Sequence, residues 1–253
     1  MAKPFYVLKR LAAFTILAPA LLLSCASFAE QVDLLAYMRK HIEPQSFIGL
    51  EPNDIPRYDR SRHFGGWKHQ DHSNPCQNTR ATVLTRDADP SVPLRYTNSR
   101  NCTVARGLWH DSYTGRTVEI AGDIQIDHVV PLKEAYYAGA HAWTSAVRCN
   151  YANYISNDFH LRAVDAHENM SKSDKGPEKY LPPNPADQCR YVNAWMKIKA
   201  VWRLKTTESE VRAIQDVFRR QGCDDLMRYM NSEELTQQRA KAIQPIASCE
   251  NRP

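Results

Sequence analysis

Asp127 and His128 are adjacent residues whose side chains could together hydrolyse a phosphodiester bond. A neutral imidazole takes a proton from water near pH 7. A carboxylate holds a hard divalent cation such as Mg²⁺, which stabilises a phosphate and its leaving oxygen. An isolated Asp-His pair is more often a surface hydrogen bond, so its interpretation depends on the residues that accompany it.

A second set of polar residues lies at positions 157–177, in the stretch NDFHLRAVDAHENMSKSDKGP. His160 begins a short apolar run, and Asn169 and Lys172 follow that run. An amide oxygen is a further ligand for a hard cation, and a lysine ammonium group is a point charge that pairs with phosphate. The two stretches together contain carboxylate, imidazole, amide and ammonium side chains.

Two strands and a helix are the elements that must position these residues. Residues 124–130 are mostly β-branched and alternate, which predicts a strand with His128 on one face and Asp127 on the other. Residues 160–164 predict a second strand. Asp165 and Glu168 have the spacing of a capping box, so we expect a helix to begin at Asp165.

The flanking sequence predicts further elements around this group. Turns are expected at 108–116 and 121–123, a strand at 117–120, and helices at 132–142 and 211–221, the last one preceded by a capping box of Thr207 and Glu210. The stripe of Trp195, Ile198 and Trp202 is typical of a helix that faces the core.

Other histidines have a weaker case for function. The spacing of His63, His69 and His72 permits metal binding, but we expect these residues at the surface, and we expect His110 and Asp111 in a turn.

The order of these motifs resembles the ββα-metal endonucleases, also called HNH or His-Me finger enzymes. The closest likeness is to a branch of small secreted HNH-family proteins whose domain also occurs in GmrSD-type restriction enzymes. It is carried by IDHVVPLKEAYYAGA at 126–140, by residues 157–177 and by LPP at 181–183, with further likeness at 102–120 and 191–204. These segments span most of residues 76–223.

The resemblance implies a role for each matching position. Asp127 and Asn169 match metal ligands, His128 matches the general base, and Lys172 matches a basic position that meets phosphate. His160 stands where the family usually has Asn. Its role stays open between orienting His128, contacting the metal and packing. His128, His160 and Lys172 are the predicted catalytic residues.

We therefore predict an endonuclease that uses one divalent metal, Mg²⁺ in the first place, or a softer metal if His160 is a ligand. We favour DNA over RNA as the substrate, with little sequence specificity because no helix-turn-helix or zinc finger is evident. Lys172, Lys175 and Arg162 are the predicted contacts to nucleic acid. Alternatives are a non-catalytic nucleic-acid-binding protein with the same fold, an exported metal-binding structural protein, and an envelope lipoprotein.

The first 29 residues have the pattern of a secretory signal peptide, with a basic start, an apolar run from Leu11 to Ser24, and small residues before position 30. A signal anchor is one alternative and a lipid anchor at Cys25 is another. We expect a secreted or periplasmic protein without stable membrane insertion. The formal charge of +5 falls to about +2 without the three basic residues of this leader, which is no strong signature of polyanion binding.

Six cysteines remain after the leader, an even number that predicts up to three disulfides in an exported chain. They are Cys76, Cys102, Cys149, Cys189, Cys223 and Cys249. The sequence leaves their pairing open.

The predicted fold is α+β, with a ββα-metal core embedded in helical and loop surroundings. We expect residues 30–75 to form a helical and loop leader, and residues 76–253 to form an HNH-type nuclease domain whose core spans about 117–177.

Overall fold

The computed structural model describes residues 1, 30–42, 55–69, 76–244 and 246–250. The predicted signal peptide, the alternative lipid anchor at Cys25, and His72 lie outside these residues. No helix in the described ranges combines the length and the apolar composition needed to cross a membrane.

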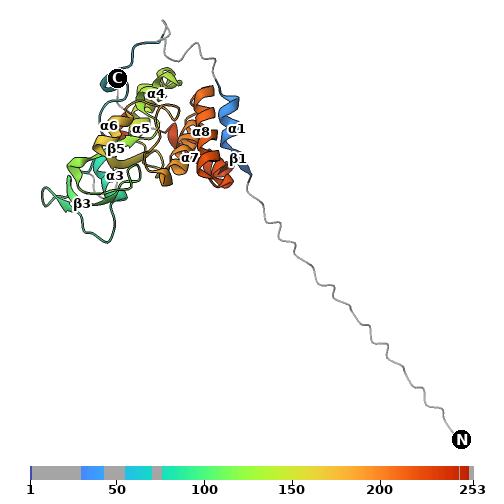
Figure 1. The fold of residues 1–253 in the computed structure, drawn as a ribbon. Coiled ribbons are helices and arrows are strands. Elements are labelled where there is room, and N and C mark those ends of the chain that lie inside the picture. The colour runs from blue at the N-terminus through green and yellow to red at the C-terminus, as the bar shows by residue number, and fades with distance from the viewer. Residues whose placement is uncertain (2–29, 43–54, 70–75, 245, 251–253) are drawn as a thin grey trace.

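The described chain is a mixed α/β fold (Figure 1). Its α-helices are α1 (Leu34–Lys40), α2 (Arg60–His63), α3 (Thr79–Asp87), α4 (Leu132–Tyr137), α5 (Ser145–Ala152), α6 (Ala166–Lys172), α7 (Pro185–Val201), α8 (Glu208–Gln221), α9 (Ser232–Ala242) and α10 (Ala247–Glu250). Its strands are β1 (Gln31–Asp33), β2 (Arg95–Tyr96), β3 (Val104–His110), β4 (Thr117–Ile120), β5 (Ile124–His128), β6 (Leu161–Asp165) and β7 (Tyr229–Asn231). Short 3₁₀ helices are η2 (Ala121–Asp123), η3 (Ala140–Ala142) and η4 (Asp225–Arg228).

The strands of the described ranges form three small sheets, in which the pairing is antiparallel throughout. Their orders are β1-β7, β2-β3-β4 and β5-β6. In the β5-β6 pair, Asp127 lies opposite Arg162 and His128 lies opposite Leu161. The polar pair of the sequence therefore sits at one end of a two-stranded sheet.

The β5-β6 pair and α6 are the strand, strand and helix predicted from the motifs. The side chain of Asp165 accepts a hydrogen bond from the backbone N–H of Glu168 at 2.9 Å, so the predicted helix start is confirmed. Ile124 and Ile126 pack into a small core with Val83, Leu84 and Trp109. The strand ends at His128 rather than at residue 130, and the next two valines enter the larger core.

The larger core lies among α1, α4, α5, α7 and α8, and Figure 1 shows α1, α7 and α8 gathered on the side of the molecule away from β3. Trp195, Ile198 and Trp202 are 0%, 0% and 5% exposed, which confirms the predicted core stripe. Thr207 and Glu210 form the predicted capping box of α8. Part of the expected leader belongs to this core, because Leu34 and Met38 of α1 are fully buried.

The helix predicted at 132–142 is wrong in its second half. Helix α4 ends at Tyr137, and Gly139 then adopts a φ of 128° before η3 begins. A glycine tolerates this conformation because it has no Cβ. The chain is thereby turned away from the helix axis immediately after the first two turns.

The six cysteines of the described chain form three disulfides, Cys76–Cys102, Cys149–Cys249 and Cys189–Cys223. The prediction of up to three disulfides is confirmed. The second bond closes the longest loop, with a sequence separation of 100, and it ties the C-terminal helix α10 to α5.

Candidate active site

A hollow with a volume of about 460 Å³ opens beside the end of β5 and the start of α6. It brings together three of the predicted site residues, Asp127, His128 and Asn169. The other polar residues that line it are Tyr58, Arg60, Gln125, Lys133, Ser173 and Asp174. His160, Arg162, Lys172 and Lys175 are not among its lining residues.

Asp127 is held by two side chains below the hollow. Its Oδ1 accepts a hydrogen bond from the Nζ of Lys172 at 2.8 Å, and its Oδ2 accepts one from the hydroxyl of Tyr113 at 2.7 Å. Burial raises the pKa of Tyr113 well above its usual range, and the neighbouring carboxylate adds to this shift. The phenol therefore stays protonated and acts as a donor to Asp127.

Lys172 lies beneath Asp127 and is 0% exposed, so it does not reach the surface of the hollow. Its Nζ also donates to the backbone oxygen of His128 at 3.0 Å. Burial lowers the pKa of Lys172, while the Asp127 carboxylate opposes that shift. In this position the lysine fixes both the acid and the backbone of the histidine.

His128 is oriented by a backbone carbonyl. Its Nε2 lies 2.9 Å from the oxygen of Ala152, at the last residue of α5. A carbonyl oxygen only accepts, so Nε2 carries the proton and the lone pair is on Nδ1. Burial lowers the pKa of His128 well below 6.5, with nearby Arg60 among the smaller causes. The imidazole is thus neutral at pH 7 and able to accept a proton.

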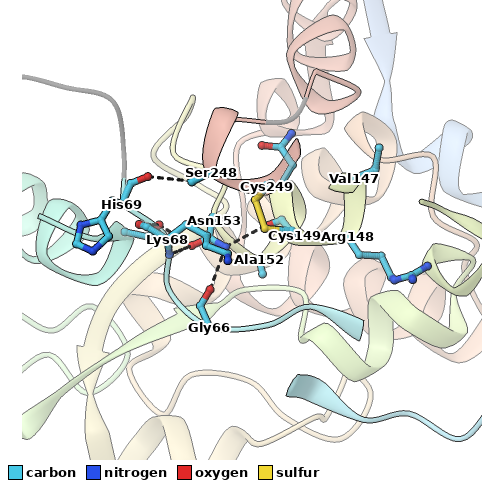
Figure 2. The surroundings of a disulfide bond; sticks show 12 residues. Gly66, Lys68, His69, Val147, Arg148, Cys149, Ala152, Asn153, Ser248 and Cys249 are labelled. Carbon is cyan, nitrogen blue, oxygen red and sulfur yellow. Dashed lines mark hydrogen bonds between the residues drawn. A yellow bond between two sulfur atoms is a disulfide. The ribbon is translucent and has the colours of Figure 1, made fainter. Parts of the chain in front are cut away.

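The indole of Trp67 lies parallel to the His128 ring, with ring centroids 5.4 Å apart and planes inclined by 5°. The backbone beside Trp67 is fastened to the end of α5, because the N–H of Lys68 donates to the Oδ1 of Asn153 at 2.8 Å. Figure 2 shows this contact next to Ala152 and the Cys149–Cys249 disulfide.

His160 is placed behind this group rather than in the hollow. It is 1% exposed, its Nε2 donates to the backbone oxygen of Tyr151 at 2.8 Å, and its ring packs among Tyr151, Tyr154 and Trp202. Burial lowers the pKa of His160 to about 4. Its backbone oxygen accepts from the N–H of Val129 at 3.2 Å, directly after the strand that carries the Asp-His pair.

Asn169 reaches the hollow from the middle of α6. Its Nδ2 donates to the Oε1 of Gln125 at 2.8 Å, and Gln125 lies two residues before Asp127 on the same strand. Because residues two apart on a strand share a face, Gln125 and Asp127 both point toward α6. Within the described ranges, no hydrogen bond reaches the amide oxygen of Asn169.

These residues fit a hard divalent cation. The Asp127 carboxylate has about four lone-pair sites, of which the two hydrogen bonds use two. With the amide oxygen of Asn169 it provides a donor set of oxygen atoms, the type that Mg²⁺ prefers. The described residues contain no group of three or more His, Cys, Asp and Glu side chains that could hold a metal.

The remaining predicted contacts to nucleic acid lie apart from the hollow. Arg162 pairs with Asp187 at 3.3 Å, and Lys175 is exposed after the end of α6, where its Nζ donates to the backbone oxygen of Ser171 at 2.7 Å. The cations at the hollow are Arg60 and Lys133 instead.

Sequence reasoning missed Tyr113, Trp67 and Arg60, which reach the site from distant segments. The contribution of a backbone carbonyl such as that of Ala152 cannot be predicted from residue types, because every residue has one. The expectation for His63 was wrong, because this residue is buried and stacks on Tyr136 with ring centroids 4.4 Å apart. His69 is exposed as expected.

His110 and Asp111 lie where β3 meets the predicted turn. His110 is the last residue of β3, and its exposed ring pairs with Asp89 at 2.8 Å. Asp111 is buried and accepts from Thr114 within the turn.

Comparison with known proteins identifies one family. The sequence profile of the GmrSD restriction endonucleases, C-terminal domain, matches residues 86–217, which include the whole β5-β6-α6 unit. An uncharacterized secreted protein of Arthroderma benhamiae is 40% identical over 142 residues, a stretch that covers 56% of this chain and 66% of that protein, just under two thirds of its length. No solved structure matches the chain.

Proposed function

The chain belongs to the family of the GmrSD restriction endonuclease C-terminal domain, and from this premise we propose that it is an exported, metal-dependent endonuclease with an HNH-type core. The proposed substrate is nucleic acid, DNA before RNA, cut with little sequence specificity. The proposed core is the β5-β6-α6 unit, within the span of about 117–177.

One observation carries this proposal. His128, neutral and with its Nε2 proton donated to Ala152, lies at the same hollow as Asp127 and Asn169. A general base with an open lone pair beside two oxygen ligands is the arrangement that activates water next to a bound phosphate.

In the proposed reaction, Nδ1 of His128 takes a proton from a water molecule as its oxygen attacks phosphorus. The bond from phosphorus to the leaving ester oxygen breaks, and that oxygen takes a proton from solvent. Ala152 keeps the imidazole in the required tautomer throughout, because its carbonyl accepts from Nε2.

Asp127 and Asn169 would hold the cation. When bound, a divalent cation neutralises charge on the phosphate and on the leaving oxygen. Lys172 and Tyr113 support that role by fixing the Asp127 carboxylate from below.

Export is supported by three disulfides, which persist in oxidising compartments, and by the secreted relative. The signal-peptide pattern of the first 29 residues points the same way.

The test is cleavage of plasmid DNA by the oxidised protein without residues 1–29, with Mg²⁺ or with EDTA. We expect cleavage with Mg²⁺, none with EDTA, and a loss of at least 100-fold in His128→Ala, in line with the usual contribution of a general base. The matched control is His167→Ala, which removes an exposed histidine on α6.

The opposing result is a folded wild type that cuts neither DNA nor RNA with Mg²⁺, Mn²⁺, Ca²⁺ or Zn²⁺. Retained binding to DNA in that experiment would favour a non-catalytic binding protein with this fold.

A further inference from the structure

We propose that Arg60 and Trp67, from a segment ahead of the family match, complete the nuclease site: Arg60 binds the substrate phosphate, and Trp67 positions His128 and Arg60. This inference rests on the proposed function. The segment of residues 55–69 carries α2, and the family match begins only at residue 86.

Arg60 is the cation at the hollow whose charge has no acidic partner among the described residues. Lys133, the other cation that lines the hollow, pairs with Asp174 at 2.8 Å. The nearest acid in sequence, Asp59, instead accepts from the N–H of Arg62 at 2.8 Å and from Ser61 at 2.7 Å. An exposed, unpaired guanidinium at a hollow with a general base is a fitting partner for phosphate.

The indole of Trp67 contacts both the Arg60 guanidinium and the His128 ring. The guanidinium carbon of Arg60 lies 5.9 Å from the centroid of the indole, within the range of a cation–π contact. The His128 ring lies parallel to the same indole at 5.4 Å. One aromatic side chain therefore places a cation and a base at defined positions relative to each other.

The support for Trp67 comes from the same element that orients His128. Asn153, at the end of α5, accepts from the N–H of Lys68 at 2.8 Å, and the hydroxyl of Thr79 donates to the backbone oxygen of Lys68 at 3.1 Å (Figure 2 shows the first contact). The preceding residue of α5, Ala152, accepts from Nε2 of His128. The end of α5 therefore fixes His128 in two ways. Ala152 binds the Nε2 edge of its ring directly, and Asn153 holds the segment whose Trp67 lies against its face.

The chemical need for such a cation follows from the charges at the hollow. The charge of Asp127 is already offset by buried Lys172, and that of Asp174 by Lys133. A guanidinium gives two parallel hydrogen bonds to a phosphate, which fixes its orientation as well as its charge. Arg60 would thereby hold the phosphate in line with the water that His128 activates.

The first experiment distinguishes a specific phosphate contact by Arg60 from the general effect of removing one positive charge. Arg60→Ala is compared with Arg60→Lys and with Arg57→Ala, an exposed arginine three residues earlier that does not line the hollow. Steady-state cleavage is measured in Mg²⁺. We expect kcat/KM to fall at least tenfold in Arg60→Ala, to recover in part in Arg60→Lys, and to stay within twofold of wild type in Arg57→Ala.

A binding measurement keeps the result independent of cleavage. Anisotropy of a labelled DNA duplex is followed with each protein in EDTA, over a series of salt concentrations. We expect Arg60→Ala to weaken binding and to reduce the slope of log K against log salt by about one, as loss of one phosphate contact does. Equal binding and equal slopes for Arg60→Ala and Arg57→Ala would overturn the assignment of Arg60.

The second experiment tests Trp67 as a positioning residue. Trp67→Phe keeps a planar ring beside His128, whereas Trp67→Leu fills much of the volume without one. We expect kcat to fall about tenfold in Trp67→Leu and to be largely rescued in Trp67→Phe, with KM changed less than kcat in both folded variants. Equal kcat in the two variants would overturn the role of the ring.

Failure of the proposed function gives a different pattern from failure of this inference. If wild type does not cleave but Arg60→Ala alone loses binding, the nuclease proposal falls and the phosphate contact stands. If wild type cleaves and all arginine variants behave alike, the nuclease stands and the phosphate contact falls.

Discussion

The ion pair between Lys172 and Asp127 is the most deeply buried charged contact at the site, with side chains 0% and 4% exposed. A buried ion pair adds little net stability over an apolar pair. Removing one partner is strongly destabilising, because it leaves the other charge buried without compensation. Lys172 also donates to the backbone of His128. We therefore assign its main effect to the geometry and stability of the strand end.

Lys172→Met should destabilise the fold by about 3–5 kcal/mol, because it leaves the Asp127 carboxylate buried with Tyr113 as its remaining donor. Lys175→Met, at an exposed lysine just after α6, should change stability by less than about 0.5 kcal/mol. The measurement is urea denaturation of both variants and wild type.

A partial recovery in the double variant Lys172→Met/Asp127→Asn would confirm that the stranded charge is the cause. A loss below about 1 kcal/mol in Lys172→Met would contradict the burial argument. A phosphate-binding role would instead change the salt dependence of DNA binding and leave stability intact.

The family resemblance predicted that Asp127, His128 and Asn169 share a site, and the three do line one hollow. Spacing predicted the strand and the start of the helix that carry them, because alternation and capping are local properties. Trp67 and Tyr113 were not predicted as site residues, because they contact the motif across long sequence separations. Lys172 was expected to contact phosphate, and no local pattern distinguishes such a lysine from one that pairs beneath a carboxylate.

Among the elements, α5 orients two histidine rings, a role that its sequence did not predict. Its last two residues, Tyr151 and Ala152, accept from the rings of His160 and His128. Its cysteine, Cys149, is bonded to Cys249 and fully buried (Figure 2). The position of the proposed base therefore depends on a helix that is bonded to α10.

Removal of the Cys149–Cys249 bond should cost more stability than removal of the Cys76–Cys102 bond. Loop closure predicts about 4.7 kcal/mol for the 100-residue separation and about 3.5 kcal/mol for the 26-residue separation. Urea denaturation of the two paired Cys→Ala variants measures this difference. We also expect the first variant alone to lose kcat, because only α5 holds the carbonyl that orients His128.

Equal losses of stability in the two variants, together with unchanged kcat, would show that α5 keeps its position without the bond. The Cys189–Cys223 bond offers a third reference, since it joins α7 to a cysteine two residues after the end of α8, and neither cysteine lines the hollow.

Local signals predicted the elements of the chain well where caps and alternation were clear. The starts of α6 and α8 are where Asp165 and Thr207 place them. The early end of α4 was missed, because a single Gly139 in an otherwise helical pattern is compatible with either outcome. The pairing of six cysteines depends on tertiary contacts that no local pattern encodes.

At the scale of the whole molecule, the first and last strands of the described residues lie side by side. Strand β1 pairs with β7, and α1 packs against α7 and α8. Charged groups also link distant elements, since buried Lys199 of α7 contacts Glu134 of α4 at 2.7 Å and Glu210 of α8 at 3.0 Å. The predicted division into a leader and a nuclease domain stays a hypothesis at this scale, although both parts contribute to one core.

The acid stability of the whole molecule follows from histidines that are buried in the neutral form. His160 has a pKa of about 4 in the folded state because of burial, and burial also holds the pKa of His128 well below 6.5. Above about pH 6.5 neither state binds these protons, so stability is unaffected. Between about pH 6.5 and pH 4 only the unfolded chain binds them, and stability falls as the pH falls.

For His160 alone, the loss between pH 7 and pH 5 should be about 2 kcal/mol, at about 1.4 kcal/mol for each pH unit below 6.5. His160→Gln keeps a donor for the Tyr151 carbonyl and cannot titrate, so its stability should fall less steeply over this range. His167→Gln, at an exposed histidine of α6, is the matched control and should follow wild type. Urea denaturation at pH 7, 6 and 5 measures the three slopes. Carboxylates with a lowered pKa, such as Asp89 at about 2, change the stability only at lower pH. Parallel stability curves for wild type and His160→Gln above pH 5 would therefore contradict the proposal that His160 is buried in its neutral form.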